Sequence, residues 1–116
     1  MVDRIDIAHE IWDMKYRLKT PDGQLVDKTI EDTWRRVSRA LASVESDPSH
    51  WEPVFYQALD GYRFLPGGRI LAGAGAGRTV TLHNCFVMGA IDDDMASIFE
   101  NLREAALTMQ QGGGIG

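Results

Sequence analysis

Residues 79–116 read TVTLHNCFVMGAIDDDMASIFENLREAALTMQQGGGIG and contain the only cysteine of the chain. From Thr79 to Met88 apolar and polar residues alternate, which predicts an extended strand. One face of this strand would carry Val80, Leu82, Phe86 and Met88, and the other Thr81, His83 and Cys85. We therefore expect the Cys85 thiol to face a cavity, with the backbone of Asn84 beside it.

An acidic turn and an amphipathic helix follow this strand. Each of Asp92, Asp93 and Asp94 is able to cap a helix by accepting an amide hydrogen bond. Apolar residues then recur at spacings of three and four, which predicts one apolar stripe along the helix. The stripe consists of Met95, Ile98, Phe99, Leu102, Ala106 and Met109. Gly112 is the expected C-terminal breaker, and the glycines after it would let backbone amides approach an anion closely.

Three shorter helices are predicted upstream. The first spans residues 7–18 and ends before a turn at Thr20–Gly23, where proline and glycine favour a reversal. The second begins with a capping box at Thr29–Asp32, and the third with a capping box at Ser49–Glu52. The residues expected to face inward are Ile11, Met14, Leu18, Ile30, Trp34, Val37, Leu41, Val44, Val54, Phe55 and Leu59. On their own, these helices indicate a small bundle without a catalytic group.

A glycine-rich stretch joins the helices to the strand. Residues 64–77 include GAGAG, which superficially resembles a phosphate loop. No clear strand precedes this run, no Lys-Ser/Thr pair follows it, and no acidic residue lies at the spacing that binds a ribose. The pattern therefore favours a flexible connection.

Composition limits the classes of function. With 116 residues the chain forms one domain at most, and a chain of this size buries roughly two-thirds of its unfolded surface. The net charge of -5 and the lack of a basic stripe argue against binding to nucleic acid. No apolar run reaches the roughly 20 residues of a membrane span, and no signal-peptide core is evident. A single cysteine excludes an intrachain disulfide and fits a reducing cytoplasm, while the three histidines lack metal-ligand spacing.

The segments TLHNCFVMG and LREAALTMQQGGGIG closely resemble the adenosylcobalamin-dependent (class II) ribonucleotide reductases of bacteria. The resemblance covers Thr79–Gly116 and extends back through RFLPGGRILAGAG, residues 63–75. It implies a mainly α fold, with a helical N-terminal bundle over residues 1–78. Residues 79–116 would then form the first strand and the long helix of a ten-stranded α/β barrel, most of which lies outside this chain.

The resemblance also implies roles for individual residues. Cys85 would be one of two thiols that reduce the ribose 2′ position. Contacts to the substrate would come from Gly68, Asn84, Cys85 and Gly114. Because Gly68 replaces a serine or threonine of many relatives, its contact would use the backbone. An aspartate of the acidic turn would bind the effector nucleotide, and counting along the motif from either end leaves Asp92 and Asp93 both open.

Cofactor and partners follow from the same resemblance. The parent enzyme would use adenosylcobalamin, bound by a surface outside this chain, so that the segment alone binds no cofactor. Its partners would be a ribonucleotide, either di- or triphosphate, a nucleotide effector, and the rest of the reductase or a companion subunit. The Asp94–Gln111 helix would pack against its twin in a homodimer.

Three hypotheses about function result. The chain is the N-terminal segment of such a reductase, whether a piece of a split enzyme or a truncated one. Alternatively, it is a stand-alone nucleotide-binding or dimerisation module, or a helical structural protein with an incidental cysteine. We expect the isolated chain to be inactive, because the cysteine that carries the radical is missing. We also expect it to self-associate, since a single strand leaves backbone groups unpaired.

Overall fold

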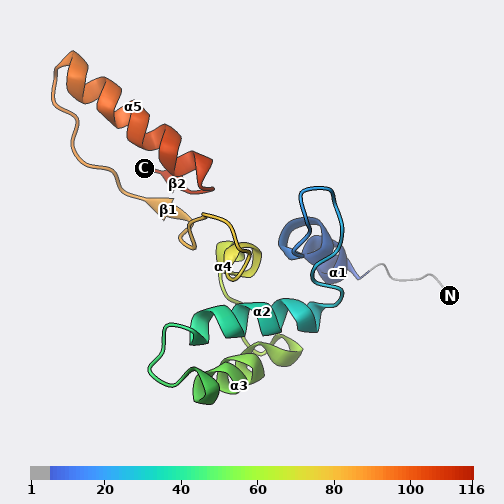
Figure 1. The fold of residues 1–116 in the computed structure, drawn as a ribbon. Helices are drawn as coiled ribbons and strands as arrows, with labels where there is room; N and C mark the ends of the chain where they lie inside the picture. The colour runs from blue at the N-terminus through green and yellow to red at the C-terminus, as the bar shows by residue number, and fades with distance from the viewer. Residues whose placement is uncertain (1–5) are drawn as a thin grey trace. The chain divides into compact units, whose positions relative to one another are not determined.

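The computed structural model describes residues 6–116 and is mainly helical, as the sequence predicts. The chain divides into two compact units, Met1–Gly77 and Arg78–Gly116. The first unit contains α1 (Ile7–Ile11), the π-helical turn η1 (Trp12–Tyr16), α2 (Ile30–Ala42), α3 (Pro48–Leu59), the 3₁₀ turn η2 (Asp60–Tyr62) and α4 (Gly68–Gly73) (Figure 1). The second contains β1 (Cys85–Phe86), α5 (Met95–Gln110) and β2 (Gly114–Ile115).

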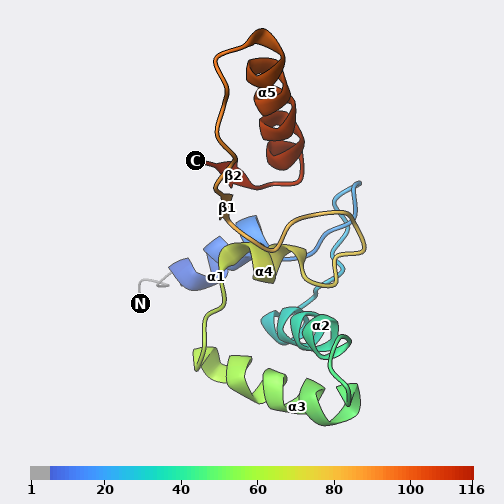
Figure 2. The ribbon, with the colours of Figure 1, turned by 90° about the vertical axis from the view of Figure 1, so that its left-hand side faces the viewer.

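Helix α2 organises the first unit and packs along α3 (Figure 2). The capping box predicted at its start is confirmed, because the Thr29 side chain accepts from the Asp32 amide and the Asp32 carboxylate accepts from the Thr29 amide at 3.1 Å. The Trp34 ring lies edge-on to the rings of Tyr56 and Tyr62. The buried core cluster consists of Trp34, Val37, Leu59 and Ala74. Apolar burial at the interface of these helices stabilises the unit.

The first predicted helix is shorter and turns a different face inward. It changes from α1 to η1 at Trp12 and ends at Tyr16, two residues earlier than expected. Trp12 is buried and its indole N–H donates to Thr33 Oγ1 at 2.8 Å. Ile11 and Met14, which were predicted to face inward, are exposed. A π-helical turn shifts the hydrogen-bond spacing from four to five residues. The inward-facing residues predicted from α-helical spacing are therefore wrong in this segment.

Helix α3 begins at a different cap from the predicted one. Asp47, not Ser49, is the N-cap, and its side chain accepts from the His50 amide at 3.2 Å. Pro48 follows at the first helical position, where its fixed φ angle suits a helix and its missing N–H costs nothing. The Ser49 hydroxyl instead donates to Asp47 at 2.7 Å. This bond is the main cause that lowers the pKa of the Asp47 carboxyl from its ordinary value.

The predicted inward faces of α2 and α3 are only partly confirmed. Leu59 is buried, and the chain turns after it at Gly61, whose φ is +64°. Val44 is exposed because α2 ends at Ala42, two residues before it. Val54 is also exposed. Fewer residues of α2 and α3 are therefore buried than the apolar stripes in the sequence predicted.

The glycine-rich connection contains a helix. Residues predicted to be flexible form α4, which packs against both α2 and η1. Beyond α4, Gly75 has a φ of +70°, and a Cβ placed there would lie 3.0 Å from Arg36 Cγ and 3.2 Å from the Arg36 carbonyl oxygen. At Gly75 the glycine therefore permits close packing against α2.

The second unit is a small parallel β–α–β arrangement (Figure 1). Strands β1 and β2 pair with Cys85 opposite Gly114. The Gly114 amide donates to the Asn84 carbonyl at 2.8 Å, and the Gly116 amide donates to the Phe86 carbonyl at 2.9 Å. Helix α5 makes the connection, as parallel strands require.

The strand predicted over Thr79–Met88 is reduced to two residues, and part of the expected anion-binding glycine run is its partner strand. A ladder extends only as far as a neighbour supplies backbone groups, and β2 is short. Before β1 the chain bends, because Thr81 Oγ1 accepts from the His83 amide at 3.1 Å. The premise that the strand finds no partner within the chain is therefore wrong.

Helix α5 has the predicted ends. Asp94 is the N-cap and accepts from the Ser97 amide at 3.0 Å. After the helix, the Gly113 amide donates to the Thr108 carbonyl and the Gly112 amide to that of Met109. Together with the Gly112 φ of +90°, these two bonds form a Schellman motif. Gly112 is thus confirmed as the breaker.

The apolar stripe of α5 does not face the strands of its own unit. Met95, Ile98, Phe99, Leu102 and Met109 are all exposed, whereas Ala105 is buried. The stripe is therefore an apolar surface that the strands of its own unit do not cover. Among residues 6–116, no helix is long and apolar enough to cross a membrane.

Candidate functional site

Cys85 lies on β1 with an exposed, free thiol. Its neighbour Phe86 points to the other face, because successive strand residues alternate. A Cβ on Gly113 would lie 2.8 Å from the Phe86 ring and 3.1 Å from the Thr108 methyl group. Only glycine fits at this position without a shift, so Gly113 holds Phe86 close to α5. The Cys85 thiol is consequently left on the opposite face.

The cavity expected beside the thiol stays a prediction, because the barrel that would enclose it lies mostly outside this chain; one cavity of the second unit lies on the Phe86 side of β1. A cavity of about 340 Å³ is lined by Thr81, Phe86, Leu107, Thr108 and Gln111, and Cys85 does not line it. His83 lies outside β1, so the strand face that it was predicted to share with Cys85 does not form, and its ring lies 5.9 Å from the Phe86 ring. Within this unit the thiol faces solvent.

Three predicted substrate contacts converge at β1. A Cβ on Gly114 would lie 3.2 Å from Cys85 Sγ, so any side chain there would press against the sulfur. The Asn84 carbonyl accepts from the Gly114 amide at 2.8 Å. The pairing of β1 with β2 therefore places Asn84, Cys85 and Gly114 side by side, although they lie on opposite sides of α5 in the sequence.

The three aspartates of the acidic turn differ: one caps α5, and the carboxylates of the other two are available to a ligand. Asp94 takes the cap, as described above. Asp92 supports the same turn with its backbone, because its amide donates to Ser97 Oγ at 2.9 Å and its carbonyl accepts from the Asp94 amide at 2.8 Å. The side chains of Asp92 and Asp93 are exposed and accept no hydrogen bond within the described part of the chain. Both remain candidates for the effector contact.

Gly68, the fourth predicted substrate contact, belongs to the first unit and begins α4. A Cβ at this position would lie 3.1 Å from Tyr16 Cε1. A side chain on residue 68 would therefore press against the Tyr16 ring. Nothing in the sequence pattern links these two residues, and Tyr16 was not predicted to lie near a site.

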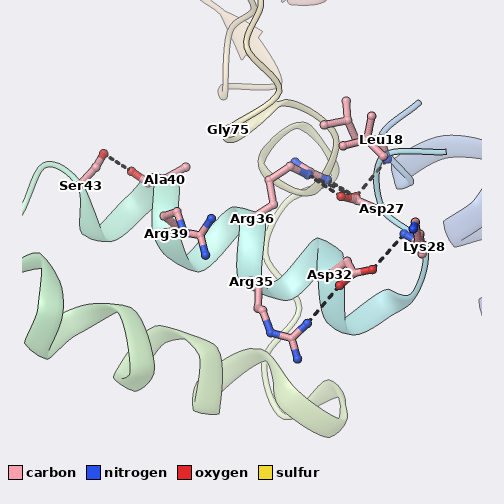
Figure 3. A pocket seen from close by; sticks show the side chains of 11 residues that line it. Leu18, Asp27, Lys28, Asp32, Arg35, Arg36, Arg39, Ala40, Ser43 and Gly75 are labelled. Atoms are coloured by element: carbon pink, nitrogen blue, oxygen red, sulfur yellow. Dashed lines mark hydrogen bonds and ion pairs between the residues drawn. The ribbon is translucent and has the colours of Figure 1, made fainter. Parts of the chain in front are cut away.

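A charged cavity of about 690 Å³ in the first unit was also not predicted (Figure 3). Its charged lining residues are Asp27, Lys28, Asp32, Arg35, Arg36 and Arg39. Arg36 reaches from α2 to Asp27 with an Nη2–Oδ2 distance of 2.9 Å, and Arg35 bonds to Asp32 at 3.0 Å. Arg36 also donates to the Leu71 carbonyl of α4 at 2.8 Å, so we assign the Arg36–Asp27 pair a role in holding α2, α4 and the loop before α2 together.

Metal ligands do not cluster in the described residues, and two cavities of the second unit are small. Within residues 6–116, no three side chains of histidine, cysteine, aspartate or glutamate gather as metal ligands would. Two cavities of the second unit measure about 340 and 360 Å³, near the lower end of roughly 300–1,000 Å³ for sites that hold drug-sized ligands. Cobalamin is much larger than such ligands and does not fit them.

Comparisons with known proteins cover most of the chain. Residues 3–79 match the family model described as ribonucleotide reductase, all-alpha domain. The ribonucleoside-diphosphate reductase subunit alpha of Chlamydia muridarum is 30% identical over 95 residues, which is 82% of this chain and 9% of the relative. The proteins of the same name from Chlamydia trachomatis and Chlamydia pneumoniae are 30% and 31% identical over 77% of this chain and 8% of each relative. The chain thus spans less than a tenth of the length of these relatives.

Proposed function

The chain belongs to the ribonucleotide reductase family, and from this membership we propose that it is the N-terminal part of an enzyme that reduces ribonucleotides to deoxyribonucleotides. The match of residues 3–79 to the all-alpha domain is the observation that carries the proposal. The names of the chlamydial relatives specify ribonucleoside diphosphates, and we extend that substrate class to the parent enzyme. The free thiol of Cys85 agrees with a cytoplasmic location, where thiols are kept reduced.

Cys85 would supply one of the two thiols that the reaction consumes. Replacing the 2′ hydroxyl of ribose by hydrogen requires two electrons and two protons, and water leaves. Two thiols provide both when they join as a disulfide. Because this chain contains a single cysteine, the second thiol must come from the rest of the parent enzyme. The exposed position of Cys85 on β1 supports this role, since a second thiol is able to reach it.

The backbone around β1 would hold the substrate. Gly114 leaves the thiol uncovered, and the hydrogen bond from the Gly114 amide to the Asn84 carbonyl holds both residues next to it. Gly68 would contribute a further backbone contact from the first unit. Strand β1, helix α5 and strand β2 would be the first elements of a ten-stranded α/β barrel, a fold assembled from such parallel units. The exposed stripe of α5 would meet its twin in a homodimer.

From the resemblance of residues 79–116 we propose that adenosylcobalamin is the radical source. The remainder of the parent enzyme would hold it. When bound, this cofactor supplies a carbon-centred radical. The relatives are named as alpha subunits, which favours a companion subunit as the alternative source. The residues in this chain would bind substrate and effector under either alternative.

The first prediction separates these cases. A complete enzyme that contains this segment is expected to form deoxycytidine diphosphate from cytidine diphosphate with adenosylcobalamin and a dithiol, whereas the 116-residue chain alone forms none. The product is measured by chromatography against a control without protein. Turnover that needs a second subunit instead of adenosylcobalamin would reassign the radical source. No turnover under either condition would refute the proposed function.

The second prediction concerns the effector. If Asp92 or Asp93 binds the effector ribose, its replacement by alanine in the complete enzyme is expected to remove effector-controlled choice among substrates, while turnover without effector stays within about twofold. The control is Glu100→Ala on α5, whose side chain bonds to Arg103 at 3.0 Å and lies outside the acidic turn. Substrate choice that is unchanged in both single variants and in the double variant would leave these carboxylates without this role.

A further inference from the structure

A tyrosine of η1 covers the glycine that the proposed function assigns to the substrate. A Cβ on Gly68 would lie 3.1 Å from Tyr16 Cε1 and 3.3 Å from the Tyr16 hydroxyl oxygen. Contacts this short are tighter than nine in ten real Cβ contacts, so a side chain at position 68 and this tyrosine orientation compete for one volume. The glycine at position 68 therefore lets the Tyr16 ring and hydroxyl lie closer to the backbone of α4 than a Cβ would ordinarily allow.

The Tyr16 hydroxyl is available to a ligand. Tyr16 is held through its main chain, because its carbonyl accepts from Arg36 Nη2 at 3.3 Å. Arg36 is in turn fixed by its ion pair with Asp27. Within residues 6–116 the side chain makes no hydrogen bond, and the residue is half-buried. A tyrosine hydroxyl both donates and accepts hydrogen bonds. The Tyr16 hydroxyl is therefore available for a hydrogen bond to a ligand.

The residue after Gly68 carries a positive charge. Arg69 follows Gly68, is exposed, and forms no ion pair in the part of the chain that the structure describes. A guanidinium offers only donors and suits phosphate oxygens. The phenol hydroxyl adds a donor that forms a strong bond when its acceptor is ionised.

We infer that the Tyr16 hydroxyl donates a hydrogen bond to a phosphate oxygen of the ribonucleotide substrate. This inference rests on the proposed function, because it takes Gly68 as a point of contact with the substrate. Tyr16 would set substrate affinity and would take no part in the radical chemistry at Cys85.

The test is Tyr16→Phe in the complete enzyme, with cytidine diphosphate as the probe. This change removes the hydroxyl and keeps the ring over Gly68. We expect Kd and KM to rise by about 10- to 150-fold, the effect of one lost hydrogen bond to a charged group, while kcat falls much less. Tyr62→Phe is the matched control, because Tyr62 packs on Trp34 in the same unit and should bind the probe normally.

A second pair of variants distinguishes loss of the hydrogen bond from loss of the fold. Tyr16→Ala frees the volume over Gly68, and adding Gly68→Ser places a hydroxyl in it, so affinity is expected to recover at least in part. Thermal unfolding of both variants shows whether the fold survives. Equal Kd values for Tyr16→Phe and the unmodified enzyme, with turnover intact, would overturn the inference alone. An unmodified enzyme that neither binds nor reduces cytidine diphosphate would overturn the proposed function with it.

Discussion

The Cys85→Ser variant of the complete enzyme is expected to lose turnover driven by a dithiol, by about three orders of magnitude or more, as when a reacting group is removed from an active site. Serine has nearly the shape of cysteine, so the pairing of β1 with β2 should persist. A hydroxyl, however, cannot join a second thiol as a disulfide. The two electrons that reduce the ribose would then have no source.

Deoxycytidine diphosphate formation and equilibrium binding of cytidine diphosphate are measured in parallel. Binding should change little, because the backbone contacts of Asn84 and Gly114 remain. The matched control is His83→Gln, two residues earlier, whose ring lies 5.9 Å from the Phe86 ring and whose loss should leave turnover within about twofold. Substantial turnover in Cys85→Ser would remove this residue from the mechanism.

The features that the sequence predicted well are local. The capping box at Thr29 and the glycine breaker after α5 each involve residues within one or two helical turns, so their backbone bonds depend little on the rest of the fold. Helix α2 was predicted for the same reason, because its apolar positions repeat with helical spacing. Such signals indicate where a helix lies, but not what covers it.

The features that the sequence did not predict depend on distant partners. Alternation over Thr79–Met88 indicated ten extended residues, yet only Cys85 and Phe86 find a neighbouring strand. That neighbour is Gly114–Ile115, a run too short and too rich in glycine to signal a strand. The stripe of α5 was real, but its exposure shows that periodicity identifies an apolar face without identifying its partner.

In the candidate site, too, local sequence motifs were predicted and contacts between distant segments were not. Cys85, Asn84 and Gly114 were identified from a motif, and the structure supplies the reason that they lie together, which is the register of β1 with β2. Tyr16 was not identified, because its relation to Gly68 is a packing contact between a π-helical turn and α4. Charged residues that pair across long sequence separations, such as Asp27 and Arg36, also leave no periodic signal.

Arg36 is the residue whose loss should destabilise the first unit most. Asp27 is 2% exposed and receives three kinds of hydrogen bond: from the Arg36 guanidinium at 2.9 Å, from the Thr33 hydroxyl at 2.7 Å and from the Leu18 amide at 3.0 Å. Arg36 also donates to the Leu71 carbonyl at 2.8 Å, which ties α4 to α2. One guanidinium therefore joins the loop before α2 to the helix that carries Gly68 (Figure 3).

We expect Arg36→Met to lower the free energy of unfolding by about 3–5 kcal/mol, the range observed when one partner of a buried ion pair is removed. Methionine replaces much of the apolar stem but leaves the Asp27 carboxylate buried beside no positive charge. Domains are stable by only about 5–15 kcal/mol, so this loss should remove about a fifth or more of the total stability. Urea titration followed by tryptophan fluorescence reports on this unit, because Trp12, Trp34 and Trp51 all belong to it.

Arg39→Met, one helical turn further along α2, is the matched control. The Arg39 side chain is 72% exposed and meets Glu52 at 3.3 Å, and exposed pairs contribute only about 0–1 kcal/mol. The double variant Asp27→Asn with Arg36→Met removes the stranded charge as well, and should regain at least about 1 kcal/mol relative to Arg36→Met. If the double variant is no more stable than the single one, the loss arises from the missing bonds to the α4 carbonyls. If Arg36→Met is as mild as Arg39→Met, the buried pair does not hold these helices together.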